Sequence, residues 1–247
     1  MYLPRSGGKM YLNTLGKNEM YLSVAEILGT DIEVVKKFVI ENADEIVDYH
    51  YDEHSIEQMN LDSLINGNAP KRIDSLIVNH ITPRESKESI WQEGLLTLSH
   101  ALTKKTALSN YLKELGFTFS FDEKQIVMSM NDKIVEVENK LGTNLKMRLG
   151  GEKTLNDYNV NGYLFVSEFE QEAIRGWLGS PEFLKSLAIY YNKNSIADNY
   201  ADKCYNYFVP FEVPLDKVDI EGFSDKIDAD RKTDILLRYT INALERV

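Results

Sequence analysis

The stretch SLIVNHITPRESKESIWQEGLLTL, residues 75–98, decides the expected fold because its character changes at His80. The apolar run at 75–81 predicts a β-strand. In the sequence T-P-R-E, residues 82–85, a threonine is followed three positions later by a glutamate, which is the capping-box pattern of a helix start. Gly94 is the expected end of that helix. His80 would therefore lie at a strand end, beside a helix N-terminus suited to a phosphate group.

A second segment has the same order of strand, cap and helix. The residues NGYLFVS, 161–167, predict a strand whose Tyr163 could place its ring against a ligand. Ser167 and Glu170 form another capping box, and apolar residues at helical spacing follow. A core histidine at His80 and ordinary packing of helices on strands would explain the same patterns without any ligand.

Together, these two segments resemble the first two motifs of the ADP-ribosyltransferase-like families. Those families include poly(ADP-ribose)-polymerase-type enzymes, tRNA 2′-phosphotransferases and DNA-modifying relatives. The H-I-T of residues 80–82, a short helix and the I-W-Q-E-G-L of residues 90–95 are similar to the first motif, and the strand around Tyr163 is similar to the second. The resemblance covers residues 75–247 in order. It implies a split antiparallel sheet that binds NAD in a cleft.

The resemblance also implies roles for individual residues. His80 would hydrogen-bond the ribose next to nicotinamide, the backbone after it would hold the carboxamide, and Tyr163 would stack on the nicotinamide ring. Arg84 could add positive charge beside a phosphate. The residues expected to bind NAD are His80, Ile81, Thr82, Arg84, Tyr163 and Ser167.

A late acidic residue completes the resemblance, because the families often place one at the front of a strand to orient the ribose or activate the acceptor. The sequence DILLRYTI, residues 234–241, indicates a last strand, and Asp234 stands at its front. Glu212, in the aromatic strand expected at 204–213, is the other candidate. A carboxylate there would stabilise the positive charge that develops as the nicotinamide–ribose bond breaks. The expected catalytic residues are His80, Asp234 and Glu212, with no metal.

The fold class expected for the whole chain is α+β, because strands and helices mix without strict alternation. Residues 1–71 are expected to form an N-terminal arm and a small helical module, and turn residues at 66–70 mark the border. Residues 72–247 are expected to form the ADP-ribosyltransferase-like α+β domain. Further expected elements are helices at 21–49, 99–116, 168–177 and 181–191, a strand at 117–121, and a hairpin around Asn131 and Asp132.

The charge of the chain, −11 over 247 residues, argues against broad binding to nucleic acid. The expected helix pair within residues 21–49 is similar to a helix-turn-helix, yet residues 21–60 hold ten acidic residues and two lysines. DNA binding is therefore not expected, and a protein partner suits residues 21–60 better. With one cysteine and no apolar run long enough for a membrane, the sequence favours a cytoplasmic protein.

A metal-based alternative rests on His50, Glu53 and His54, which spell H-x-x-E-H. Their strongly polar surroundings argue against a dry zinc site and favour a solvated acidic helix. The leading hypothesis is thus an NAD-dependent ADP-ribosyltransferase that modifies a protein, nucleic acid or small-molecule acceptor. The alternative from another class is a non-catalytic interaction protein that keeps the same scaffold and binds a partner through its N-terminal helices.

Overall fold

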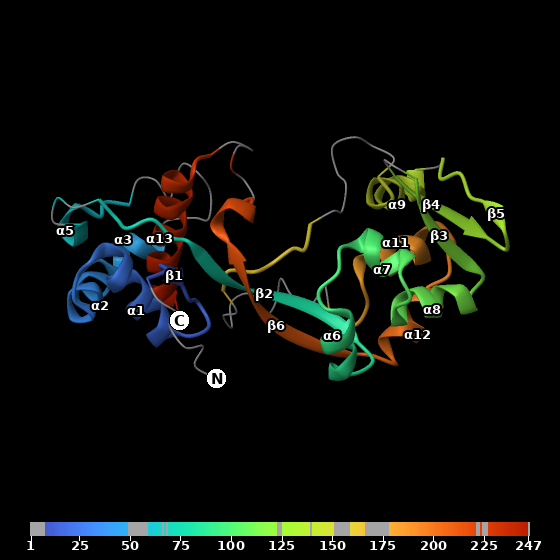
Figure 1. Cartoon of the computed structure of the whole chain (residues 1–247), viewed down its shortest axis with the longest axis horizontal. Helices are drawn as coiled ribbons and strands as arrows, with labels where there is room; N and C mark the ends of the chain where they lie inside the picture. The colour runs from blue at the N-terminus through green and yellow to red at the C-terminus, as the bar shows by residue number, and fades with distance from the viewer. Residues whose placement is uncertain are drawn as a thin grey trace. The chain divides into compact units, whose positions relative to one another are not determined.

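The computed structural model describes residues 8–48, 59–65, 67, 69–122, 125–138, 140–150, 159–165, 178–220, 223 and 227–246. The chain is mixed α and β, with two small sheets of three strands each (Figure 1). It divides into two compact units, each assembled from separate segments. Unit 1 comprises Met1–Asn79, Tyr163–Glu170 and Pro210–Val247, and unit 2 comprises His80–Gly162 and Gln171–Val209. The predicted border near residue 71 is not where the units divide.

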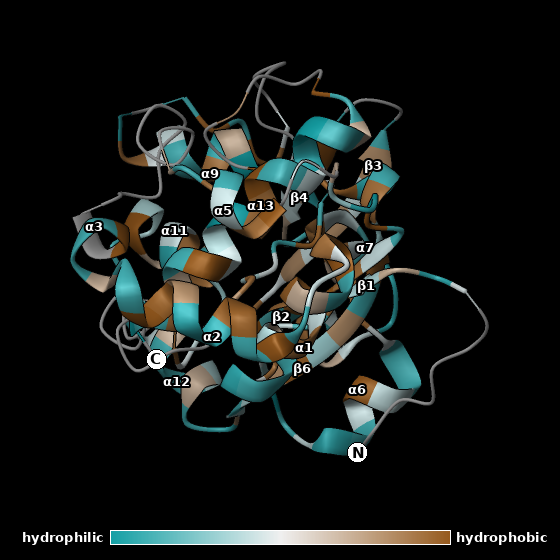
Figure 2. Cartoon of the chain, turned by 90° about the vertical axis from the view of Figure 1, so that its left-hand side faces the viewer, coloured by the Kyte–Doolittle hydropathy of each residue, from teal (hydrophilic) through white to brown (hydrophobic). Residues whose placement is uncertain are grey.

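Unit 1 is mainly helical. Helices α1 (Lys17–Leu28), α2 (Ile32–Glu41) and α3 (Ala43–Asp48) follow one another closely, and short α5 (Asp62–Ile65) comes after them. Gly29 ends α1 with a φ of 66°, and the side chain of Asp31 caps α2 by accepting a bond from the backbone N–H of Glu33 at 2.8 Å. Hydrophobic residues recur along α1, α2 and the C-terminal helix α13 (Ala229–Arg246) (Figure 2). The buried core they share includes Leu12, Val24, Ile27, Val35, Leu76, Ile235 and Ile241.

The first sheet has the strand order β1-β2-β6. Strand β1 (Tyr11–Leu12) runs parallel to β2 (Ser75–Arg84), with Tyr11 opposite Ser75. Strand β6 (Tyr205–Pro214) lies on the other side of β2, and a 3-10 turn (Leu215–Lys217) follows it. The backbone N–H of Leu215 donates to the carbonyl of Asp74 at 3.0 Å, so the end of β6 is held at the beginning of β2.

Unit 2 combines short helices with a meander of three antiparallel strands. The strands are β3 (Phe117–Asp122), β4 (Gln125–Met130) and β5 (Lys133–Ile134). Asn131 and Asp132 connect β4 to β5 with φ values of 49° and 64°, which are typical of a two-residue hairpin turn. The predicted hairpin is therefore confirmed. The helices are α6 (Lys87–Glu93), α7 (Leu98–Thr103), α8 (Ala107–Glu114), α9 (Thr143–Arg148), α11 (Glu182–Tyr190) and α12 (Ser195–Ala201), with a 3-10 turn at Lys140–Gly142.

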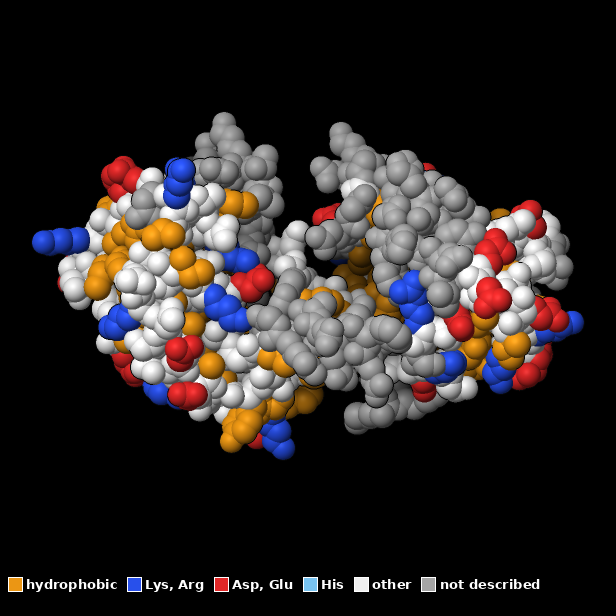
Figure 3. Space-filling view, turned by 180° about the vertical axis from the view of Figure 1, so that it is seen from behind, with side chains coloured by type: hydrophobic (Ala, Val, Ile, Leu, Met, Phe, Trp, Pro, Cys, Tyr) orange, Lys and Arg blue, Asp and Glu red, His pale blue; other side chains and the backbone are white. Residues whose placement is uncertain are grey.

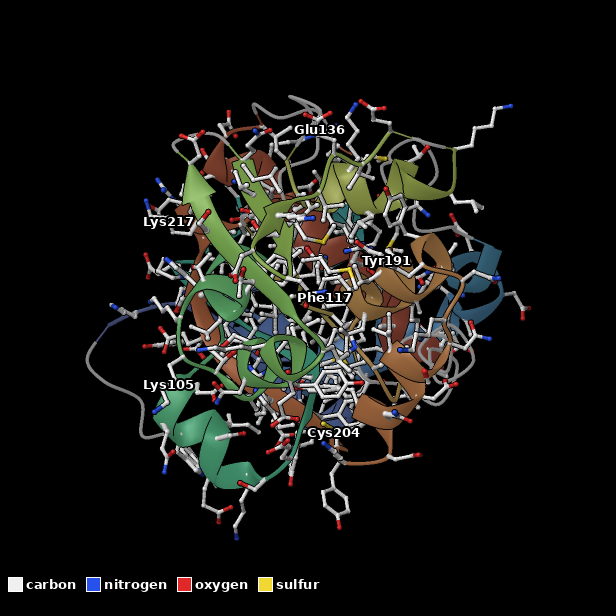
Figure 4. The ribbon with its side chains drawn as sticks, turned by 90° about the vertical axis from the view of Figure 1, so that its right-hand side faces the viewer. Lys105, Phe117, Glu136, Tyr191, Cys204 and Lys217 are labelled. Atoms are coloured by element: carbon white, nitrogen blue, oxygen red, sulfur yellow. The ribbon has the colours of Figure 1, made fainter. Side chains whose placement is uncertain are left out.

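The core of unit 2 is separate from that of unit 1. Aromatic rings interlock in it: those of Phe117 and Tyr191, both labelled in Figure 4, meet edge to face with their centroids 5.2 Å apart. The most buried members of this core include Leu112, Met128, Leu145, Phe183, Leu187 and Tyr200. Acidic and basic side chains are interspersed with apolar ones on the face seen in Figure 3.

Several sequence predictions about secondary structure are wrong. The strand expected at 161–167 is, within the described residues 161–165, only an isolated bridge at Tyr163. Residues 234–241 lie in the helix α13 and not in a strand, because Asp228 caps that helix through the N–H of Arg231 and its apolar residues are buried at helical spacing. The single helix expected at 99–116 is two helices, α7 and α8. Thr106 separates them because it forms a capping box with Ser109.

None of the helices within the described ranges combines the length and the hydrophobicity that crossing a membrane requires.

Candidate functional site

The strand β2 continues four residues beyond His80, which changes the expected site. The predicted capping box at residues 82–85 is wrong, since Thr82 and Arg84 belong to the strand, and α6 starts at Lys87 after the N-cap residue Ser86. A residue that precedes proline favours extended backbone, and β6 lies alongside β2. His80 is thus a residue within a strand, without the helix N-terminus that was expected next to it. Gly94, with a φ of 71°, ends α6 as predicted.

The segment at residues 161–163 lies beside β2. The backbone N–H of Asn79 donates to the carbonyl of Tyr163 at 2.8 Å, and the N–H of Tyr163 donates to the carbonyl of Asn79 at 2.7 Å. The next residue, His80, places its Nδ1 2.7 Å from the carbonyl oxygen of Asn161. Two sequence motifs that are far apart in the chain are therefore joined by direct hydrogen bonds.

The imidazole of His80 has a defined protonation state in this arrangement. Burial lowers the pKa of His80, and the nearby positive charge of Arg84 lowers it further, against the opposing effect of the bond to Asn161. The ring is therefore neutral at neutral pH. Because a carbonyl oxygen only accepts hydrogen bonds, Nδ1 carries the proton, which leaves Nε2 as an acceptor.

Thr82 and Arg84 share the face of β2 on which His80 lies, because alternate residues of a strand point to the same side. Both are buried, with exposed fractions of 3% and 9%. Arg84 makes one long hydrogen bond, from Nη2 to the carbonyl of Gly94 at 3.4 Å. Its Nε is buried and has no hydrogen-bond partner among the residues that the structure describes. Ile81, on the opposite face, is half-buried.

Besides His80, Tyr200 and Cys204 of unit 2 interact with Arg84 electrostatically. Tyr200 on α12 is completely buried, and its ring packs on that of Tyr111 with the centroids 5.1 Å apart. Cys204, labelled in Figure 4, comes just before β6 and is half-buried. Burial raises the pKa of the Tyr200 hydroxyl and the pKa of the Cys204 thiol, and Arg84 opposes both shifts. Both groups therefore stay protonated at neutral pH.

The two candidate acids belong to unit 1, whereas His80 belongs to unit 2. Asp234 lies on α13, where its Oδ2 accepts a bond from Nε of Arg238 at 2.9 Å. Glu212 lies on β6 and accepts a bond from the hydroxyl of Ser75 at 2.8 Å. Ser75 precedes His80 by five residues, about 16 Å along a strand. The predicted position of Asp234 at the front of a strand is wrong because that segment is helical.

Several predicted residues lie outside the described part of the chain. These are Ser167 with the helix expected after it, and the zinc candidates His50, Glu53 and His54. Among the residues that are described, no group of three or more His, Cys, Asp or Glu side chains could hold a metal ion.

Comparison with known proteins adds no relative, since the chain matches no protein-family model, no curated protein and no solved structure.

Sequence reasoning missed Asn161 and Tyr200. Asn161 contributes its backbone carbonyl, which every residue has, so no residue type could have revealed it. Tyr200 follows Ile196 and Ala197 at helical spacing, a pattern that indicates only a core position. Its electrostatic interaction with Arg84, which is far from it in the sequence, depends on the tertiary fold.

Proposed function

We propose that this protein is an NAD-dependent ADP-ribosyltransferase-like enzyme. In this proposal, His80 binds the ribose next to nicotinamide, the backbone of Ile81 and Thr82 holds the carboxamide, and the ring of Tyr163 stacks on the nicotinamide. ADP-ribose is transferred to a protein, nucleic acid or small-molecule acceptor. The observation that carries the proposal is the pair of hydrogen bonds between Asn79 and Tyr163, because it sets the two motifs of the resemblance side by side.

The state of His80 supports its role toward a ribose. Its Nδ1–H is anchored on the carbonyl of Asn161, so the ring has a fixed orientation and a fixed tautomer. Nε2 can then accept a hydrogen bond from a ribose hydroxyl. The lowered pKa keeps the ring neutral, so it adds no positive charge near a sugar that becomes cationic when the nicotinamide bond breaks.

The acid is the part of the proposal with the least support. Asp234 is engaged by Arg238, and Glu212 is exposed but bonded to Ser75 near the start of β2. This observation favours a second candidate function, in which the chain binds NAD or another nucleotide without transferring any group, as an interaction protein would.

The test is release of nicotinamide from NAD by the full chain, with binding of NAD followed by calorimetry. His80→Ala should lower both by about tenfold or more, because a hydrogen bond to the ribose is lost. His100→Ala is the matched control, since His100 is an exposed histidine of the same unit whose ring, among the described residues, is hydrogen-bonded to Thr97 alone. Its activity should equal that of the wild type.

The outcomes separate the two candidates. Nicotinamide release that falls in Glu212→Ala or in Asp234→Ala would support the transferase and identify its acid. Binding of NAD without release, whatever acceptor is offered, would support the binding protein. The absence of both binding and release in the wild type would rule out any role for NAD.

A further inference from the structure

Arg84 is a buried cation for which the described part of the chain provides no paired carboxylate. Its side chain is 9% exposed, its Nε has no partner among the described residues, and its one hydrogen bond is the 3.4 Å contact to Gly94. The adjacent Glu85 is exposed, and no ion pair joins the two within the described chain. Burying an unpaired charge is costly, because the protein interior replaces its hydration shell poorly.

Other arginines of this protein differ from Arg84 in this respect. Arg148 on α9 pairs with Glu182, and Arg238 on α13 pairs with Asp234. In both cases a carboxylate from the same chain balances the guanidinium charge. Arg84 is more deeply buried, yet no carboxylate of the residues that the structure describes is in hydrogen-bond contact with it.

Two of the groups that interact electrostatically with Arg84 are hydrogen-bond donors, and the exposed carboxylate of Glu85 acts on the same two groups. The hydroxyl of Tyr200 is completely buried and interacts with the thiol of Cys204, a weak hydrogen-bonding group, and it has no oxygen or nitrogen partner among the described residues. Thr82, on the same face of β2, adds a second hydroxyl, and the thiol of Cys204 adds a weak donor. Because the phenol and the thiol remain protonated, they can donate and do not repel an anion.

We propose that the guanidinium of Arg84 and the hydroxyl of Tyr200 bind a phosphate group of a ligand. A guanidinium offers a planar fork of donors that matches phosphate oxygens, and a charge-assisted pair of this kind is among the stronger hydrogen bonds. His80 lies four residues away, about 13 Å along the strand, so one extended ligand could reach both residues. The inference deepens the proposed function and rests on it for the position of Arg84 beside a phosphate of NAD, but it can be tested separately, because inorganic pyrophosphate carries the same chemical group without nicotinamide.

The experiment measures binding of inorganic pyrophosphate and of ADP-ribose to the full chain by calorimetry and by thermal unfolding, with sodium chloride at the same ionic strength as the reference. The wild type should bind at least one of the two anions and be stabilised by it. Arg84→Met should weaken that binding by about tenfold or more. Tyr200→Phe should weaken it by a smaller factor, and Arg148→Met, which removes a paired arginine of the same unit, should leave it unchanged.

Arg84→Met also separates a binding role from a structural one. Without ligand, this variant should unfold at the same temperature as the wild type or higher, because an apolar side chain replaces an unpaired buried charge. If Arg84→Met does not fold, Arg84→Lys is the variant to measure, because it keeps the positive charge and loses the planar guanidinium. Arg84→Lys should bind pyrophosphate more weakly than the wild type.

Three results would overturn the inference: no binding of either anion by the wild type, equal binding by wild type and Arg84→Met, or equal binding by Arg84→Lys where the methionine variant does not fold. The proposed function is judged separately. Pyrophosphate binding that depends on Arg84, without nicotinamide release, would keep this inference and refute the transferase. If Arg84→Met released nicotinamide and bound the anions as well as the wild type does, the transferase would be kept and this inference refuted.

Discussion

The two halves of strand β2 bury different chemistry. The first half, residues 75–79, carries Leu76, Ile77 and Val78, which are buried among the apolar side chains of unit 1 or close to them. The second half, residues 80–84, carries a partly buried histidine, a buried threonine and a buried arginine with an incomplete set of hydrogen bonds. The division is not complete, since the first half also buries Ser75 and Asn79, and Nδ2 of Asn79 has no hydrogen-bond partner among the described residues. In the second half, His80 and Ile81 are only half-buried.

This difference leads us to expect that substitutions in the two halves of β2 affect different properties, stability in one half and ligand binding in the other. Burying hydrocarbon stabilises a fold, whereas burying a polar or charged group without partners costs free energy. Buried polar groups without partners destabilise the fold, and they are frequently found at functional sites. The first half of β2 should thus govern the free energy of unfolding, and the second half should govern the binding of ligands.

The largest effect on stability is expected in the first half. Leu76→Ala should lower the free energy of unfolding by about 2–5 kcal/mol, because it removes a fully buried side chain and leaves a cavity. Urea denaturation followed by circular dichroism would measure the loss. Leu76→Met, which conserves volume, should cost less than about 1.5 kcal/mol. If Leu76→Ala cost no more than Arg84→Met, the contrast between the two halves of β2 would disappear.

An intermediate effect is expected when a paired arginine is made to resemble Arg84. Asp234→Ala removes the carboxylate partner of Arg238, whose side chain is 15% exposed, and should lower the free energy of unfolding by about 1–3 kcal/mol. Asp234→Asn keeps an acceptor oxygen and should lose less. Chemical denaturation of both variants would test this. Arg238 keeps its hydrogen bond to the carbonyl of Met59 in this variant. Equal stability of Asp234→Ala and wild type would show that a buried arginine needs no carboxylate in this fold, which would weaken the argument from Arg84.

The smallest effect is expected in the pH dependence of stability. Burial lowers the pKa of His80 in the folded state below its ordinary value of about 6.5, so below that pH the unfolded chain binds a proton that the folded chain does not. The free energy of unfolding should therefore fall as the pH decreases from 7 toward 5. His80→Gln should show a shallower decrease over the same range, in urea titrations at several pH values. Superimposable profiles would mean that His80 is not held neutral by burial.

Local signals in the sequence predicted the elements that depend on neighbouring residues. Gly94 ends α6, and Asn131 with Asp132 forms the hairpin turn, because each depends on backbone conformations within a few residues. The capping box expected at Thr82 failed for the opposite reason. The same residues could start a helix or continue a strand, and in the fold they form part of β2, which lies beside β6.

The candidate site shows the same division. The sequence pointed to His80, Thr82, Arg84 and Tyr163, and the structure joins the two motifs through the hydrogen bonds of Asn79 and Asn161. The sequence could not show that Asp234 lies on a helix with Arg238, because a short apolar run fits a strand or a helix equally well. Nor could it show Tyr200 close to Arg84, since they lie far apart in the chain.

The amino-acid sequence by itself determined the mixed α and β character, the turns, most of the helices and the polar second half of β2, because these follow from side-chain chemistry and short-range backbone preferences. Only the tertiary structure decided which strands pair and that His80 donates to Asn161. It also decided that Arg84 is buried with no paired carboxylate among the described residues. Such contacts depend on how distant segments pack, and burial then sets the pKa of a histidine and the cost of an unpaired charge.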